Sequence, residues 1–179
     1  MLDPAAGFLL IGFFALLFAS AALHKLRDPP HFSELLRAYR VLPEHAVRLA
    51  PLVPLAELAV AAGLLAPGAR FGAALGGAAL LLVYGAAIGV NLRRGRRDLA
   101  CGCGGADDAR PIAPWMVGRN LALALLLAVT LLSWRDRPLE TTDALTVGGG
   151  AVVATLLYVC LDRLLGRVAP WTAALGGRR

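Results

Sequence analysis

Cys101 and Cys103 flank a single glycine, and this Cys-Gly-Cys sequence is the clearest candidate for chemistry in the chain. Glycine tolerates the backbone angles that bring two such close thiols together, and a disulfide between them would be strained. Strain makes a disulfide easier to reduce, which favours thiol-disulfide exchange over permanent cross-linking. The spacing therefore predicts a redox dithiol at Cys101 and Cys103, in a loop shaped by Gly102 and Gly105.

Basic residues precede this dithiol: Arg93, Arg94, Arg96 and Arg97. Positive charge favours the thiolate, which is the form of cysteine that attacks a disulfide. We therefore expect two exposed and reactive thiols beside these arginines. The third cysteine, Cys160, lies among Leu, Val and Tyr, where cysteine commonly behaves as a small hydrophobic residue.

Metal binding is the competing use of Cys101 and Cys103, because two soft thiolates suit copper(I) or zinc. Three histidines could complete such a site: His24, His31 and His45. Their spacing matches no zinc pattern, so the metal site stays an alternative and no cofactor is predicted. The sequence also contains no nucleotide-binding loop and no hydrolytic triad.

Glu57 and Arg119 are ionisable residues within apolar stretches, where a charge is costly unless it faces a cavity, reaches the interface or is paired. Pairing of these two with each other is one solution. Asn91 and Asn120 lie near the ends of apolar stretches as well. We predict an intramembrane polar network of all four residues, with a structural role at least as well favoured as a catalytic one.

The elements that must position these residues are membrane helices. Of the 179 residues, 58% are hydrophobic and 17% are charged, and the mean hydropathy is +0.67, which is too apolar for one water-soluble domain. Long apolar stretches occur at residues 4–23, 49–66, 71–92, 112–134 and 144–161. They lack the alternation of barrel strands, so we predict an all-α, polytopic transmembrane bundle with about five spans.

The distribution of basic residues predicts the orientation of the bundle. Residues 24–48 contain five of them, residues 93–110 contain five and the C-terminal tail contains four, whereas the opposite side has Arg70, Arg135 and Arg137. The positive-inside rule then places the N-terminus outside and the C-terminus in the cytoplasm, in a bacterial inner membrane. Anionic lipids account for the net charge of +6, so nucleic acid is not an expected partner.

An amphipathic segment follows the Asp28-Pro29-Pro30 helix break. Its apolar stripe consists of Phe32, Leu35, Leu36 and Tyr39. A helix of this kind either lies at the lipid headgroups or folds back under the bundle, and an ordinary connecting helix is equally consistent with the pattern.

Several short motifs in order resemble the methylamine utilisation protein MauE family, a membrane family with relatives of the DoxX type. They are His24-Lys25-Leu26-Arg27-Asp28-Pro29 with Phe32, Tyr39-Arg40-Val41-Leu42-Pro43, Pro54-Leu55-Ala56-Glu57-Leu58, Asn91-Leu92-Arg93-Arg94-Gly95, Cys101-Gly102-Cys103 with Gly105, and Trp115 with Arg119-Asn120. The resemblance covers roughly residues 5 to 130. It implies a MauE/DoxX-like four-helix domain at residues 1–135, followed by an additional helix and basic tail at residues 136–179.

The resemblance also implies a role in maturing the small, disulfide-rich subunit of methylamine dehydrogenase, by helping disulfide formation. One departure from the family is that Gly104-Gly105 follows the second cysteine, where Phe-Gly is common. The expected partners are membrane lipids and a thiol-redox protein or a disulfide-rich client. A scaffold for maturation that uses no thiol chemistry is a further alternative.

The predicted orientation conflicts with this implied role. Disulfides form outside the cytoplasm, whereas the arginines place the Cys101 loop inside it. Two solutions remain open. In one, the dithiol dips into the bundle and receives electrons across it. In the other, it takes reducing power from the cytoplasm and passes it outward.

Overall fold

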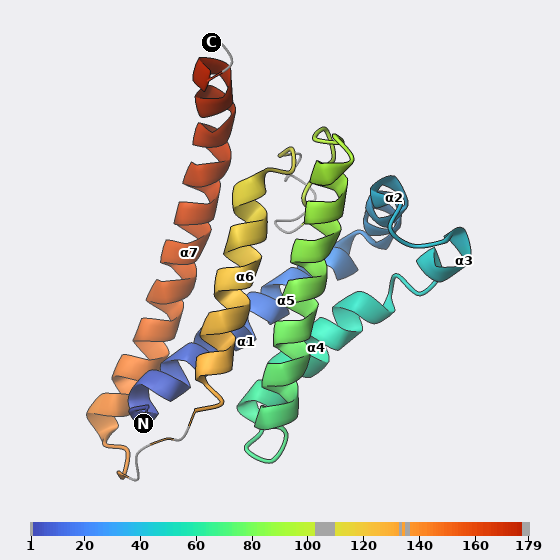
Figure 1. Cartoon of the computed structure of the whole chain (residues 1–179). Helices are drawn as coiled ribbons and strands as arrows, with labels where there is room; N and C mark the ends of the chain where they lie inside the picture. Colours follow the sequence, from blue (N-terminus) through green and yellow to red (C-terminus); the bar gives the residue numbers. More distant parts are fainter. Residues whose placement is uncertain (1, 103–109, 133, 135–136, 177–179) are drawn as a thin grey trace.

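The computed structural model of the chain is all-helical and describes residues 2–102, 110–132, 134 and 137–176 (Figure 1). The helices are α1 (Pro4–Arg27), α2 (Pro29–Tyr39), α3 (Glu44–Val47), α4 (Leu52–Leu65), α5 (Arg70–Arg93), α6 (Pro114–Val129) and α7 (Thr141–Gly176). No strand occurs among the described residues. The predicted all-α fold is therefore confirmed.

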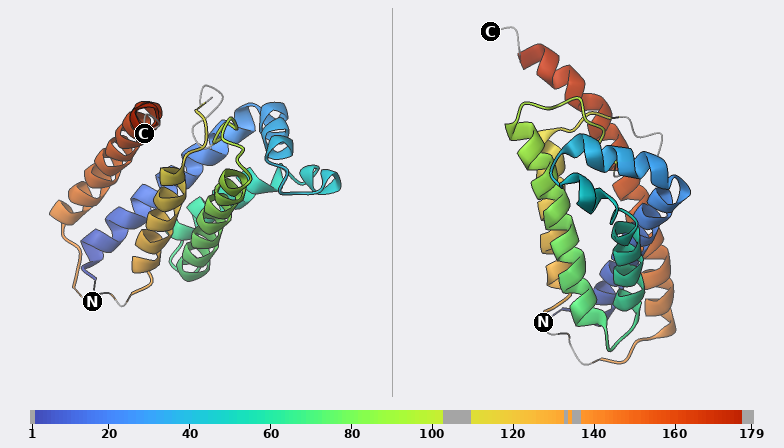
Figure 2. Two further views of the ribbon diagram at one scale, coloured as in Figure 1. Left: turned by 45° about the horizontal axis from the view of Figure 1, so that its top comes forward. Right: turned by 90° about the vertical axis from the view of Figure 1, so that its right-hand side faces the viewer.

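Helices α1 and α5 make most of the contacts in the bundle. α1 packs against α4 and α7, and α5 packs against α4 and α6 (Figures 1 and 2). Phe14, Leu64 and Leu127 are completely buried where these helices meet. Gly77 lets α6 approach α5 closely, because a Cβ atom there would lie 2.9 Å from Cδ2 of Leu127. The bundle thus brings polar residues of several helices close together.

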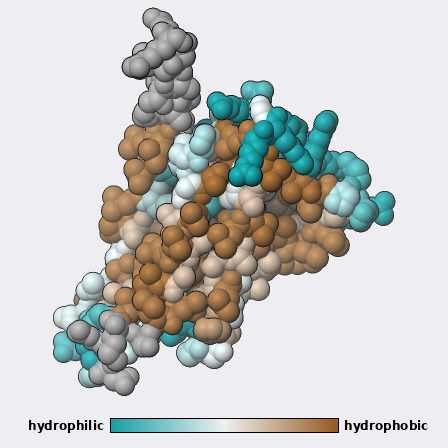
Figure 3. Space-filling model, viewed as in Figure 1, coloured by the Kyte–Doolittle hydropathy of each residue, from teal (hydrophilic) through white to brown (hydrophobic). Residues whose placement is uncertain are grey.

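The lengths of the apolar helices differ from the predicted stretches. α1, α5 and residues 141–166 of α7 are long and apolar enough to cross a membrane, whereas α4 has 14 residues and α6 has 16. α4 begins after Pro51 and ends just before Pro67, and α6 closes at Thr130, whose hydroxyl donates to the carbonyl of Leu127 at 2.6 Å. Hydrophobic residues cover the side of the bundle in Figure 3.

Helix α2 folds back across one end of the bundle. Asp28 ends α1 and caps α2, because its carboxylate accepts a hydrogen bond from the backbone N–H of His31 at 3.1 Å. Phe32 and Tyr39 on the predicted apolar stripe are both buried. α2 therefore folds back against the bundle, which is one of the predicted arrangements, and it lies at the end opposite the N-terminus (Figure 2).

Candidate functional site

Cys101 lies at the start of the connection between α5 and α6. Its backbone N–H donates to the carbonyl of Arg110 at 3.2 Å, which joins the two ends of the connection. The residue is only 6% exposed and packs with Met116 in a small cluster. The prediction of an exposed thiol is therefore wrong for Cys101. Two further members of the predicted loop, Cys103 and Gly105, lie outside the described residues.

Helix α2 covers Cys101, and Gly102 is what allows the close fit. Gly102 has a φ of 69°, in the left-handed region that favours glycine. A Cβ atom there would also lie 2.8 Å from Cδ2 of Leu35 in α2. The Tyr39 hydroxyl donates to the carbonyls of Ala100 and Cys101, at 3.2 and 3.3 Å. Both the backbone conformation of Gly102 and the narrow space between it and Leu35 thus favour glycine at this position.

Two of the four predicted arginines hold α2 in place. Arg96 donates to the carbonyl of Ala38 at 2.7 Å, near the C-terminus of α2, and Arg94 donates to the carbonyl of Arg40 at 3.1 Å. The side-chain oxygen of Asn91 accepts a hydrogen bond from Arg96 at 3.1 Å. Because these contacts are with backbone carbonyls at the end of α2, Arg94 and Arg96 hold α2 over Cys101.

The cation next to the thiol is Arg119 of α6. Its Nη2 atom lies 3.9 Å from Sγ of Cys101, and its guanidinium lies over the Trp115 ring, 5.5 Å from the centroid. Asp162 of α7 forms an ion pair with Arg119 and a second one with Arg110, at 2.8 Å. The side chains of Arg119 and Asp162 are 11% and 12% exposed. Positive charge at this position favours the Cys101 thiolate.

Glu57 is completely buried and has a different partner from the expected one. Lys25 of α1 donates to both carboxylate oxygens, at 2.7 and 2.9 Å. The Tyr84 hydroxyl of α5 donates to one of them at 2.8 Å. In place of the suggested pairing of Glu57 with Arg119, the structure gives two ion pairs, Lys25 with Glu57 and Arg119 with Asp162.

Three of the four residues of the predicted polar network nevertheless meet. Glu57, Arg119 and Asn120 line one small cavity of about 50 Å³ in the middle of the bundle. Asn91 does not line it, because its side chain lies at the end of α5 and contacts Arg96. Proximity rather than a direct ion pair therefore connects Glu57 and Arg119.

The three histidines proposed for the metal alternative do not gather around Cys101 in the described part of the chain. His24, His31 and His45 are all exposed. Within the part of the chain that the structure describes, no three His, Cys, Asp or Glu side chains lie close enough to hold a metal ion. Cys160 is exposed on α7, so it is not a buried packing residue.

Lys25, Tyr84 and Asp162 belong to the site but were not predicted from the sequence. Lys25 was counted only among the five basic residues of residues 24–48, although it lies in the last turn of the apolar helix α1, just before the Asp28-Pro29 break. Asp162 was one acid at the end of the last apolar stretch. An acid and a base at the ends of apolar stretches were the available signal, because such residues are retained where they find partners.

Comparisons with known proteins agree over most of the chain. The family model described as "Methylamine utilisation protein MauE" matches residues 4–133. Three curated proteins with the printed name "Methylamine utilization protein MauE" are similar. The protein from Paracoccus versutus is 42% identical, over 98% of this chain and 97% of its own length. Those from Paracoccus denitrificans and Methylophilus methylotrophus are 39% and 36% identical, over 97% and 92% of this chain and 94% and 88% of their own lengths. No solved structure matches.

Proposed function

The chain belongs to the methylamine utilisation protein MauE family, and on that premise we propose that it is a multi-pass inner-membrane protein that supports thiol-disulfide exchange in methylamine utilisation. The names of its relatives support the pathway, and the long apolar helices support the membrane location. We propose that Cys101 and Cys103 are the redox-active residues and that the exchange supports maturation of a disulfide-rich client.

The contact between Arg119 and Cys101 carries this proposal. A buried guanidinium 3.9 Å from a thiol favours the thiolate, and Asp162 holds that guanidinium in place. In the exchange, one thiolate attacks a partner disulfide and forms a mixed disulfide. The second cysteine then displaces the partner thiol, so Cys101 and Cys103 become a disulfide and the partner gains two electrons and two protons. The reverse sequence oxidises a partner dithiol.

We propose that the N-terminus lies outside and the C-terminus in the cytoplasm, with residues 136–179 adding a span to the domain of residues 1–135. Of the two solutions to the conflict over sides, the burial of Cys101 beneath α2 supports the one in which the dithiol dips into the bundle. A Cys101 thiol enclosed in this way exchanges electrons with a partner at the membrane rather than with free cytoplasmic thiols.

Redox cycling is tested by treating the purified protein with mild oxidant or reductant and counting free thiols by alkylation and mass shift. We expect two thiols to change state together, and Cys101→Ser or Cys103→Ser to abolish the change. Cys160→Ser is the matched control, because that cysteine is exposed on α7, and it should cycle normally. A wild-type protein with thiols fixed in one state refutes the proposal. A double Cys101→Ser, Cys103→Ser variant that still supports client maturation assigns a scaffold role instead.

Orientation is tested with single cysteines at the two ends of the bundle in a cysteine-free background. Arg97→Cys lies in the basic loop and Gly68→Cys in the connection between α4 and α5, and both positions are exposed. An impermeant maleimide should label Arg97→Cys only in inverted vesicles and Gly68→Cys only in intact cells. The opposite pattern would reverse the proposed topology.

A further inference from the structure

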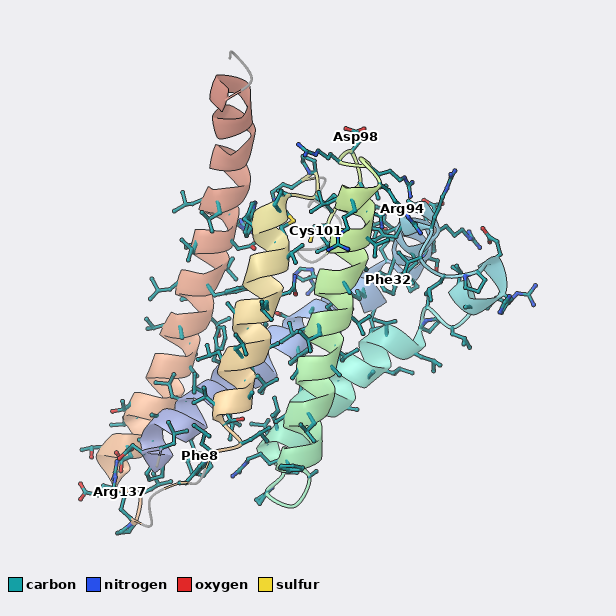
Figure 4. All side chains as sticks on the ribbon, in the orientation of Figure 1. Phe8, Phe32, Arg94, Asp98, Cys101 and Arg137 are labelled. Atoms are coloured by element: carbon teal, nitrogen blue, oxygen red, sulfur yellow. The ribbon has the colours of Figure 1, made fainter. Side chains whose placement is uncertain are left out.

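A cavity of about 180 Å³ lies against Cys101. It is larger than the cavity of about 50 Å³ that Glu57, Arg119 and Asn120 line. Its walls come from α1, α2, α4, α5 and the start of the connection that holds Cys101. Most of its lining is aliphatic or aromatic, and Lys25 is the charged residue among the described residues that line it. Figure 4 shows Phe32 of the lining at the same end of the bundle as Cys101, away from Phe8 and Arg137.

From this cavity we infer that the chain binds a membrane quinone beside Cys101 and passes electrons from the dithiol to it. The inference rests on the proposed redox function of Cys101 and Cys103 and adds the electron acceptor. A redox-active Cys101 enclosed beneath α2 needs an acceptor that reaches it from the lipid, and a quinone is an apolar carrier of two electrons. The cavity places an apolar ring site directly against the sulfur-bearing residue.

The size of the cavity suits a quinone ring. An apolar cavity of roughly 150 Å³ is sufficient to hold a benzene ring, and this one has about 180 Å³. Phe32 and Tyr84 contribute aromatic rings to the lining, and aromatic rings favour stacked or edge-on contact with another ring.

Lys25 supplies the polar group that orients the ring. Two of its N–H bonds point to the oxygens of Glu57, and the third makes only a long contact of 3.5 Å with the carbonyl of Ala21. That third N–H can donate to a quinone oxygen, and the positive charge stabilises the negative charge that develops on the oxygen during reduction. An acyl chain of a lipid would make no use of this group.

The rim of the cavity provides a path for the apolar tail of a quinone. Val41, Leu42 and Val83 belong to the lining and are 44%, 47% and 60% exposed. In an apolar bundle, exposed aliphatic residues of this kind face lipid. A quinone tail that leaves the cavity between them therefore enters lipid rather than water.

The reaction balances without a further reagent. Two electrons pass from the sulfurs of Cys101 and Cys103 to the quinone, a sulfur-sulfur bond forms, and the two thiol protons end on the two quinone oxygens. The products are one disulfide and one hydroquinone. A client or partner dithiol then reduces the disulfide and restores the starting state.

The test uses the full-length protein, reduced and placed in lipid nanodiscs with decylubiquinone. Quinone reduction is followed by absorbance, and thiol loss by alkylation and mass shift. We expect one quinone reduced for each pair of thiols lost. Ala87→Phe fills the cavity and should slow the reaction about tenfold or more, whereas Ala86→Phe, on the adjacent exposed position of α5, should leave the rate unchanged.

Controls separate failure of the inference from failure of the proposed function. Diamide oxidises accessible dithiols without a quinone. Thiols that cycle with diamide but not with decylubiquinone would overturn the quinone site and leave the redox function in place, whereas thiols that cycle with neither would overturn both. Equal rates in Ala87→Phe and Ala86→Phe would place the quinone elsewhere.

Binding is tested without any redox step by a photoactivatable azidoquinone and the double Cys101→Ser, Cys103→Ser variant. Labelling should fall on peptides of α2 and α5 that line the cavity and should be lost with Ala87→Phe. Labelling spread evenly over lipid-facing residues of α7 would show that the azidoquinone is only dissolved in the bilayer, and this result would overturn the site.

Discussion

The two buried ion pairs of this bundle have different surroundings. Lys25 and Glu57 join α1 to α4, and both carboxylate oxygens accept hydrogen bonds from Lys25. Arg119 and Asp162 join α6 to α7, and the same guanidinium reaches Sγ of Cys101. The first pair is enclosed among helices, whereas the second has a thiol as a further neighbour. We therefore expect the first to govern stability and the second to govern thiol reactivity.

The largest expected effect is loss of stability in Lys25→Met. This change leaves Glu57 buried without its cation, and breaking a buried ion pair typically costs about 3–5 kcal/mol. Unfolding of the full-length protein in mixed micelles measures it. The double variant Lys25→Met, Glu57→Gln should recover most of the loss, because the uncompensated charge is gone. A single variant as stable as wild type would show that Glu57 is already neutral or has another partner.

Arg119→Gln should mainly change reactivity. Without the guanidinium the Cys101 thiolate is less favoured, so alkylation at neutral pH should slow about tenfold and its half-maximal rate should move to higher pH. Stability should fall less than in Lys25→Met.

Arg97→Gln provides the matched control for this change, because Arg97 is an exposed arginine of the same basic loop. Its alkylation profile should stay that of wild type. If Arg97→Gln slows alkylation as much as Arg119→Gln, the general charge of the loop governs the reactivity of the thiol. The ion pair of Arg119 and Asp162 would then have no special part in it.

The sequence predicted the helical bundle and many of the residues that line its polar centre, but not their partners. Hydropathy locates apolar stretches because burial in lipid depends on composition over about 20 residues. Partners depend on how helices rotate and cross. The sequence could not show that Glu57 meets Lys25, which is 32 positions earlier, or that Asp162 reaches Arg119 from α7.

The burial of Cys101 was missed for a related reason. A loop rich in glycine and arginine is typical of exposed chain, and the amphipathic stripe of α2 was recognised without its target. That target is the loop itself, where Leu35 lies over Gly102 and Tyr39 bonds the carbonyl of Cys101.

A smaller effect is expected when the cover over Cys101 is loosened by Tyr39→Phe. The change removes one hydroxyl that bonds two loop carbonyls, worth about 1 kcal/mol, so Cys101 should be alkylated roughly fivefold faster through local opening. Ser33→Ala is the control, because that hydroxyl bonds the carbonyl of Pro29 within α2. An unchanged rate in Tyr39→Phe would mean that the arginine contacts alone hold α2.

The smallest effect is expected at the opposite end, where the ion pair of Arg137 and Asp3 is exposed. Arg137 bonds Asp3 at 3.0 Å, and their side chains are 37% and 43% exposed. Hydrogen bonds from Arg137 hold the pKa of Asp3 below its usual 3.8. A lowered pKa in the folded state stabilises the protein at pH values above the usual pKa, and this contribution is lost as the pH falls through the folded value.

Arg137→Gln should therefore melt only slightly below wild type at neutral pH, and this difference in melting temperature should shrink as the pH falls below the usual pKa of Asp3. Added salt should narrow the difference at neutral pH, because dissolved ions screen exposed pairs and leave enclosed ones largely unaffected. The same salt should leave the deficit of Lys25→Met almost unchanged. A deficit in Arg137→Gln as large and as insensitive to salt as that of Lys25→Met would mean that enclosure does not decide what an ion pair contributes to this bundle.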